Sequence, residues 1–483
     1  MAPYEPVEHG EVERYVRQVW DSDIVGSLSE LIRIPALSPA FDGDWAAGGH
    51  LRAAAEHVRA WFAAREIPGA TAEIIELDGR SPVLLLDVPA TDGATEQSGG
   101  AAGTVLLYGH LDKQPPGGQW SEGLDPWTPV LRDGRLYGRG AADDGYAGYA
   151  AVAALEAVRQ ASGSHARAVV LLETAEESGS PDLPAYLTYL ADRLGDVRLV
   201  VCLDSGGSDY RRLWLTTSLR GLAQQTVTVR VLHSGQHSGL ASGAVPSSFR
   251  VVRTLLERIE RAETGEITLS ELNVTIPEHR RKEAERAVAA VPGAAGGALP
   301  LAPGVRLVTS DEVELLLNTT WRPTLSVIGA SGLPEPAEAG NVLRAETTLA
   351  LSFRLPPTAD SAAALAAIQR ALTTDVPYGA VVELSGGEHA DGWDAPAPAS
   401  WLSAALDGVS DAVFDEPWLG VGLGGSIPFM GMLGKRYPRA QFLVTGALGP
   451  DSNAHVPDES LHLDQARRVT QAVAHLLHAH ATA

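Results

Sequence analysis

The stretch GTVLLYGHLD, residues 103–112, decides the fold that this sequence predicts. It is a nearly continuous apolar run that ends in a histidine and an aspartate, His110 and Asp112. Two later runs have the same character: ARAVVLLETAEE at residues 166–177 and VRLVVCLD at residues 197–204. Apolar runs of this kind are typical of strands that are buried on both faces of a mostly parallel sheet.

The segments around these strands complete an α/β pattern. Residues 23–31 and 50–64 space their apolar side chains at three and four, as amphipathic helices do. Residues 145–160 predict a helix between two of the strands, and residues 70–77 and 81–88 predict two further strands. Alternating helices and strands favour an α/β domain on a mostly parallel sheet.

The pattern changes after about residue 215 and returns after about residue 393. The middle part predicts the order β-α-β-β-α-β, which is the signature of a split-βαβ, ferredoxin-like α+β domain. Its six segments are QQTVTVRVL (224–232), SSFRVVRTLLERIERAE (247–263), the extended ELLLNTTWRPTLSVIGA (314–330), TLALSFRLPP (348–357), SAAALAAIQRALTTDV (361–376) and GAVVELSGG (379–387).

We therefore expect one α/β domain made from both ends of the chain, residues 1–215 and 396–483, with residues 216–395 inserted between them. In the second part, AQFLVTGAL at residues 440–448 predicts a strand, and a C-terminal helix follows from Asp464.

Composition excludes several classes of function. The 483 residues carry 37 Lys and Arg against 60 Asp and Glu, a net charge of −23, which disfavours nucleic acid and anionic membranes as partners. The single cysteine, Cys202, excludes an internal disulfide and a Cys-rich zinc module. We find no run of 18 apolar residues and no apolar leader at the acidic N-terminus, so we expect a cytoplasmic protein.

Acids and histidines follow the ends of the predicted strands. In open α/β sheets, ligands bind at the carboxyl ends of the strands, so we expect these side chains to meet there. Charges gathered this closely are costly to bury unless cations neutralise them, and imidazole with carboxylate suits Zn²⁺, Mn²⁺ or Co²⁺. The residues concerned are His110, Asp112, Glu176, Glu177, Asp204 and, after the C-terminal strand, His455.

Asp143, in the glycine-rich segment GRGAADDGYAG, could join this group. If Asp143 bridges two ions, His110 and Asp204 could complete one set, and Glu177 and His455 the other. Each ion would then keep an open position for water, as in hydrolytic two-metal sites. Two residues remain outside both sets: Glu176 as the general base, and Asp112 as the partner of the second ring nitrogen of His110.

The motifs YGHLDKQPP, LYGRGAADD, ETAEESGS, VVCLDS, SGQHSG and GPDSNAH stand in an order and spacing that resemble the aminoacylase/carboxypeptidase family of two-zinc metallopeptidases. The long block from GHLDKQPPGGQW to GRGAADD, and the later GGSIP, are most similar to the carnosinase-like dipeptidase branch. The resemblance covers nearly the whole chain, including the inserted domain.

This resemblance implies two zinc ions per subunit in a catalytic domain, with an inserted lid that also forms a homodimer. It implies that Glu176 activates the bridging water and that Asp112 tunes His110. The implied metal ligands are His110 and Asp204 for one zinc, Glu177 and His455 for the other, and Asp143 for both. His237 would steady the oxyanion in the partner subunit's site, and Arg354, Asn341 and Ser426 would hold the substrate.

Two positions depart from the family pattern. Gly145 stands where the family usually has lysine, and Leu423 replaces an acidic residue before GGSIP. Neither is an implied metal ligand, so we expect hydrolysis of dipeptides, and both lie near the substrate side, which leaves the preferred side chains open. An N-acyl-amino-acid deacylase with the same site and a non-catalytic homodimeric binding protein are the alternatives.

Overall fold

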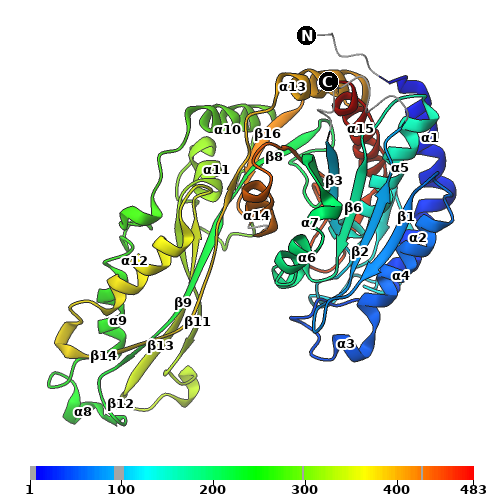
Figure 1. Ribbon diagram of the computed structural model, residues 1–483. Coiled ribbons are helices and arrows are strands. Elements are labelled where there is room, and N and C mark those ends of the chain that lie inside the picture. The colour runs from blue at the N-terminus through cyan, green and yellow to red at the C-terminus, as the bar shows by residue number, and fades with distance from the viewer. Residues whose placement is uncertain (1–6, 92–102, 296–298, 426–427) are drawn as a thin grey trace. The chain divides into compact units, whose positions relative to one another are not determined.

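The computed structural model describes residues 7–91, 103–295, 299–425 and 428–483. The chain forms two compact units, whose elements are labelled in Figure 1. The first consists of Met1–Thr216, Ala395–Gly420 and Met432–Ala483, and the second of Thr217–Asp394 and Val421–Gly431.

A six-stranded sheet forms the centre of the first unit, in the order β1-β2-β6-β3-β7-β17. The four strands β6, β3, β7 and β17 are parallel, whereas β1 and β2 form an antiparallel edge. Their bounds are Thr71–Ile75 for β1, Val83–Val88 for β2, Thr104–His110 for β3, Ala168–Glu173 for β6, Val197–Cys202 for β7 and Gln441–Val444 for β17. The α/β class and the mostly parallel sheet predicted from the sequence are confirmed.

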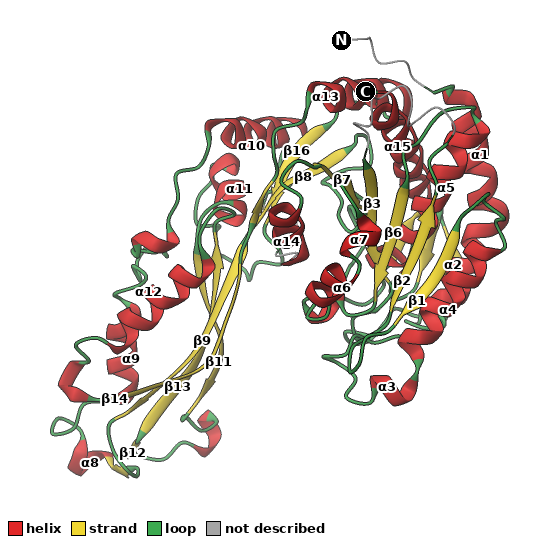
Figure 2. Ribbon diagram, viewed as in Figure 1, coloured by secondary structure: helices red, strands yellow, loops and turns green. Residues whose placement is uncertain are grey.

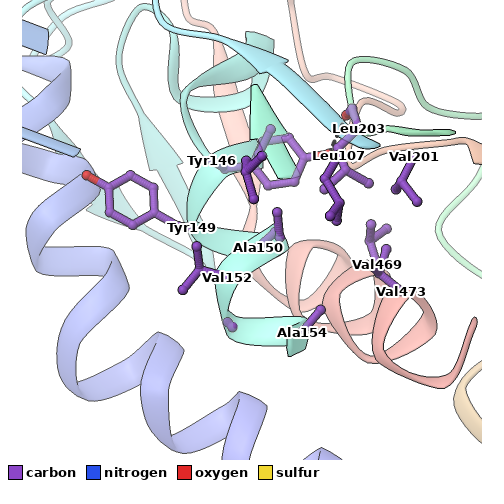
Figure 3. Packing of buried hydrophobic residues seen from close by; sticks show 14 of the residues in the cluster. Leu107, Tyr146, Tyr149, Ala150, Val152, Ala154, Val201, Leu203, Val469 and Val473 are labelled. Atoms are coloured by element: carbon purple, nitrogen blue, oxygen red, sulfur yellow. Dashed lines mark hydrogen bonds between the residues drawn. The ribbon is translucent and has the colours of Figure 1, made fainter. Parts of the chain in front are cut away.

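The central strands are apolar because both of their faces are covered. Every residue of β3 and of β6 is buried. Alternate residues of the strands pack with the helices in one continuous core, and Figure 3 shows part of it around α5. The side chains labelled there include Leu107 and Val201 from the strands, Tyr146 and Ala150 at the start of α5 (Ala147–Gln160), and Val469 and Val473 of α15 (Leu463–Thr482).

The remaining elements of the first unit frame this core. Helix α5 is rich in alanine, so its neighbours α1 and α15 can approach it closely. Those remaining elements are α1 (His9–Val19), a π-helix (Trp20–Ile24), α2 (Val25–Ile32), α3 (Trp45–Gly48), α4 (His50–Ala63), α6 (Leu183–Tyr189), α7 (Ala191–Leu194), α13 (Ser400–Val413) and a small sheet of β18 (Ser460–His462), β5 (Arg135–Tyr137) and β4 (Val130–Arg132).

The second unit contains a four-stranded antiparallel sheet in the order β11-β13-β9-β14. Helices α9 (Ser248–Leu256) and α12 (Ser361–Thr373) lie along one face of this sheet (Figure 2), and their apolar sides form its core. The strands are β9 (Gly221–Arg230), β11 (Thr324–Ser331), β13 (Glu346–Leu355) and β14 (Val381–Ala390). Read along the chain, these elements give the predicted β-α-β-β-α-β order, which is confirmed.

The prediction of extended structure over residues 314–330 is wrong in its first half. Glu312–Thr320 form helix α11, and only Thr324–Ser331 form a strand. The Asp311 side chain accepts hydrogen bonds from two backbone N–H groups at the start of α11, which stabilises the helix start. Leu317 of α11 is buried with Trp321 and with Ala284 of α10 (Glu278–Ala290).

The chain also contains several further short elements. They are β8 (Trp214–Leu219), β15 (Trp393–Asp394), β16 (Leu419–Leu423), β10 (Gln236–His237), β12 (Val342–Leu343), α8 (Ser238–Ala241) and α14 (Pro428–Arg436). Among the helices of the described ranges, none has both the length and the apolar character that a membrane span needs.

The loops that follow β7 and β17 touch through their backbones at Gly206. Its neighbour Gly207 donates a backbone hydrogen bond of 2.9 Å to the carbonyl of Leu448, and Leu448 donates one of 3.2 Å to Ser205. A Cβ atom at Gly206 would lie only 1.7 Å from the Leu448 carbonyl oxygen. Position 206 needs glycine because the loops that follow β7 and β17 cross there, backbone against backbone.

We expect Gly206→Ala to destabilise the first unit by about 1–3 kcal/mol or more, because the added methyl group overpacks against backbone that cannot rotate away. Thermal denaturation followed by calorimetry measures the loss. Gly26→Ala is the matched control, since Gly26 lies exposed in α2 with no atom near an added Cβ, and alanine there should gain up to about 1 kcal/mol. Equal melting temperatures for the two variants would contradict the expected clash.

Candidate metal centre

The first group of candidate ligands forms around His110, which ends β3 and is fully buried. Its Nε2 atom lies 3.2 Å from Oδ1 of Asp143 and 3.9 Å from Oδ2 of Asp204, which follows β7. The ligand atoms of these three residues all lie within 4.8 Å of one another. The structure therefore brings His110, Asp143 and Asp204 together as the sequence predicts.

The second group uses the other oxygen of Asp143. Nε2 of His455 lies 2.9 Å from Oδ2 of Asp143 and 3.2 Å from Oε2 of Glu177. Asp143 thus presents one carboxylate oxygen to each histidine. A carboxylate placed in this way can bridge two cations, which is the role predicted for Asp143.

The turn that carries Asp143 runs through Ala141–Gly145, and the Asp143–Asp144 peptide bond is cis. Gly145 closes this turn by donating its N–H to the Gly140 carbonyl at 3.1 Å. A Cβ atom at Gly145 would lie 2.4 Å from that carbonyl oxygen. A side chain at position 145 would therefore require this turn to shift.

Asp112 lies between the two groups and contacts both. One of its carboxylate oxygens lies 3.5 Å from Nδ1 of His110, and its backbone carbonyl oxygen lies 3.1 Å from the same nitrogen. The two carboxylate oxygens also accept hydrogen bonds from the backbone N–H groups of Glu176, at 3.1 Å, and Glu177, at 3.0 Å. Asp112 therefore orients His110 and also fixes the 3₁₀ turn Glu176–Ser178.

Glu176 belongs to neither ligand group among the described residues. Burial, and next the negative charge of Asp204, hold the pKa of Glu176 well above its ordinary value. A carboxyl group of this kind, close to the ligands yet outside both sets, suits proton transfer.

The histidines neutralise the acids in the metal-free protein. Hydrogen bonds to Asp143 and Glu177 raise the pKa of His455 to about 10. Although burial alone would raise the pKa of Asp143, hydrogen bonds from His110 and His455 lower it overall. Burial and the charge of Asp143 raise the pKa of Asp204 and of Glu177. Excess negative charge collects here, so the site favours cations.

The donor types fit divalent zinc, manganese or cobalt. Each group offers one imidazole and two carboxylates. Neither group includes a thiolate, and Cys202 is buried at the end of β7. Three protein ligands to each cation would leave a position free for water or substrate.

His237, Asn341 and Arg354 lie in the second unit. His237 of β10 pairs with Val342 of β12, and Ser238 donates its N–H to the Asn341 carbonyl at 2.8 Å, so His237 and Asn341 are neighbours and exposed. Arg354 lies near the C-terminal end of β13, where it pairs with Thr324 of β11, and it is half-buried. Ser426 lies outside the described residues.

Sequence reasoning missed three residues that hold the ligands. Gln114 donates a hydrogen bond of 2.7 Å to Oε2 of Glu177. Arg139 and Glu459 form a buried ion pair beneath the Asp143 turn. The sequence signal for Arg139 and Glu459 is their position close to predicted ligands: Arg139 lies in GRGAADD with Asp143, and Glu459 in HVPDES with His455.

The two adjoining carboxylate–imidazole groups, at and beyond the carboxyl ends of the strands of an open sheet, could hold two divalent cations, as in hydrolases that use two metal ions. The chain belongs to the peptidase family M20/M25/M40, whose model matches residues 106–479. The resemblance drawn from the motifs is therefore confirmed.

Individual relatives agree with this assignment. The cysteinylglycine-S-conjugate dipeptidase of Corynebacterium striatum is 29% identical over 388 residues, which cover 78% of this chain and 81% of the relative. Two solved structures match 99% of this chain and 100% of their own: the di-peptidase Dug1p from Saccharomyces cerevisiae, with a TM-score of 0.74 at 19% identity, and human carnosine dipeptidase 1, with 0.71 at 20%. At these identities the two structures show the fold alone.

Zinc binding should release protons. At pH 7 the metal-free protein holds a proton on His455, whose pKa is about 10, whereas a zinc ligand must be a neutral imidazole. We therefore expect at least one proton to be released, and the apparent affinity to fall by about tenfold per pH unit for each proton as the pH drops from 8 to 6. Isothermal titration calorimetry in buffers of different ionisation enthalpy counts the protons. Zinc binding that does not depend on pH would contradict the role of His455 as a protonated zinc ligand. Release of the same number of protons by the variant His455→Gln would contradict it as well.

Proposed function

We propose that this protein is a dipeptidase that hydrolyses its substrate with two divalent cations, which we take to be zinc. The observation that carries the proposal is the shared carboxylate of Asp143, with one oxygen on His110 and the other on His455. The family assignment and the dipeptidases among its relatives support the same reaction.

The cations would be held by His110, Asp143 and Asp204 in one position and by Asp143, Glu177 and His455 in the other. When bound, they supply Lewis acidity for the scissile carbonyl and lower the pKa of the attacking water. Asp112 keeps the His110 ring oriented through Nδ1, so that Nε2 faces the first cation position.

Glu176 is the proposed general base. Its backbone is fixed by Asp112, and its half-buried side chain feels the negative charge of Asp204, so that its raised pKa favours accepting a proton. Glu176 takes the proton of the attacking water at a carboxylate oxygen and then gives it to the nitrogen of the leaving amine.

The second unit supplies the proposed substrate contacts. The guanidinium of Arg354 can donate two parallel hydrogen bonds to the terminal carboxylate of a dipeptide. We assign His237 to the oxyanion in the partner subunit's site, and Asn341 and Ser426 to the remaining polar groups of the substrate. Residues 216–395 act in this proposal as the lid and dimerisation domain. We also propose a cytoplasmic location for this protein.

We propose that the homodimer forms through the exposed edge strand β11. Its residues Val327 and Ile328 are 50% and 60% exposed, and an open apolar edge is a ready template for pairing with a second chain. Wild-type protein should have twice the mass of one chain in light scattering, and Ile328→Lys should shift the protein to monomer. The matched control is Val308→Lys, which replaces an apolar residue that is 82% exposed and lies outside the sheet. A monomeric wild type would refute the dimer.

A substrate screen on zinc- and manganese-loaded enzyme tests the reaction itself. We expect turnover of dipeptides such as Xaa-Gly to exceed that of N-acetyl amino acids. Faster turnover of the acylated compounds would favour the deacylase alternative. A protein that holds metal and is inactive on both panels would favour the non-catalytic binding protein.

In the same assay, Glu176→Gln should keep the fold and both metal ions but lower kcat by about 10²–10⁴-fold, because the amide cannot accept the proton. Metal content by elemental analysis and the melting temperature serve as controls for intact structure. Near-normal kcat in this variant would remove Glu176 from the mechanism.

A further inference from the structure

Arg139 and Glu459 form an ion pair that is buried almost completely, with exposed fractions of 1% and 0% and a distance of 2.8 Å between Nη1 and Oε2. They lie 320 residues apart in the chain. Burying such a pair removes two charges from water, and well-packed apolar residues often stabilise a protein as well or better. Stability alone therefore does not explain it.

The carboxylate of Glu459 holds the turn that presents Asp143. Oε2 accepts a hydrogen bond of 3.0 Å from the Gly140 N–H. Oε1 accepts bonds of 3.0 Å from Ala142 and 3.2 Å from Asp143 itself. Three backbone donors at and just before the bridging ligand thus converge on one side chain.

The guanidinium of Arg139 holds the segment that presents His455. Its Nη2 donates to the carbonyl oxygen of Val456, the next residue, at 2.9 Å, and to that of Pro116 at 3.3 Å. Gly117 follows Pro116 and lies against the same segment, since a Cβ there would be 3.1 Å from the His455 carbonyl oxygen. The pair therefore joins the segments of both ligands.

The two histidines differ in how much support they need. His110 ends a buried central strand and its side chain is fully buried, whereas the His455 side chain is 54% exposed. His455 also has a φ of 66°, and the nearby Asp451, Asn453 and Asp458 have φ values of 62°, 55° and 65°. Asp, Asn and His adopt this left-handed conformation more readily than other non-glycine residues, so the segment around His455 is an irregular turn that no regular strand or helix supports.

We propose that the Arg139–Glu459 pair is a positioning clamp that sets the affinity of the second cation position, formed by Asp143, Glu177 and His455. This inference rests on the metal centre of the proposed function. Neither Arg139 nor Glu459 touches a cation in it; both act through the backbone of the ligand segments. The first position shares Asp143, but its other two ligands, His110 and Asp204, lie at or just beyond the ends of buried strands, so it depends less on the clamp.

Zinc titration against a chromophoric chelator tests the clamp in the full-length protein. Wild type should bind two zinc ions per chain. In Glu459→Gln and in the double variant Arg139→Met/Glu459→Met, the second zinc should bind about 10–100-fold more weakly, the usual effect of removing an outer contact of a ligand, while the first changes by less than about threefold. The melting temperature is measured on the same samples.

The double variant separates positioning from stability. Removing both charges avoids an unpaired buried ion, so the melting temperature should recover toward wild type while the second zinc stays weak. Recovery of two-zinc affinity together with the melting temperature would overturn the clamp. Arg139→Lys is the fallback if the double variant fails to fold, because lysine keeps the charge but reaches fewer acceptors, and it too should weaken only the second zinc.

Arg280→Met is the matched control. Arg280 is 5% exposed and pairs with Glu283 and Asp394 at 2.8 Å in the second unit, away from both ligand groups in the chain. The variant Arg280→Met should lower the melting temperature and leave the affinities for both zinc ions unchanged. An equal loss of zinc affinity in this control would overturn the clamp. Fewer than two zinc ions bound to wild type would overturn the metal centre itself, which distinguishes the two failures.

Discussion

The rest of the site depends on the carboxylate of Asp143, which is shared between two imidazoles. His110 and His455 approach its two oxygens at 3.2 Å and 2.9 Å, and each histidine brings a further acid with it. Negative charge in such a buried cluster must be compensated, by protons on the histidines in the metal-free protein or by divalent cations. This requirement explains why two imidazoles lie among the acids at this edge of the sheet.

The fold meets the requirement by means of parallel strands whose carboxyl ends coincide. Strands β3, β6 and β7 lie side by side, so the residues that follow them meet although the chain separates them widely. The strands fix His110 firmly, because its whole strand is buried. Asp143 and His455 lie on irregular segments instead, and buried polar side chains supply there the rigidity that a sheet would give. Asp112 acts in this way for the turn at Glu176, and the Arg139–Glu459 pair acts for the segments of Asp143 and His455.

Much of this could be predicted from the sequence. The central strands β3, β6 and β7 are predictable because continuous apolar runs indicate burial on both faces. The segments predicted at residues 70–77, 81–88 and 440–448 contain the other three strands of the sheet, β1, β2 and β17. The ligands could be predicted because they immediately follow those strands or stand in recognisable motifs. The run of leucines in α11 suits either a strand or a helix, and the Asp311 cap and the contact with α10 favour the helix. Gly145 could be identified as a departure but not explained, since the explanation is a carbonyl oxygen brought close by the turn.

The sequence by itself determined the class of fold, the identity of the candidate ligands and the acids left over for proton transfer, because apolar periodicity and strand-end residues are local properties of the chain. Only the tertiary structure decided that Asp143 faces both histidines, that Asp112 holds the Glu176 turn as well as His110, and that Arg139 and Glu459 meet beneath the site. Those contacts join residues up to 320 positions apart. Hydrogen bonds and charge pairs of this kind act over a few ångströms in space, and nothing in the local order of residues encodes which of many possible partners will be brought that close.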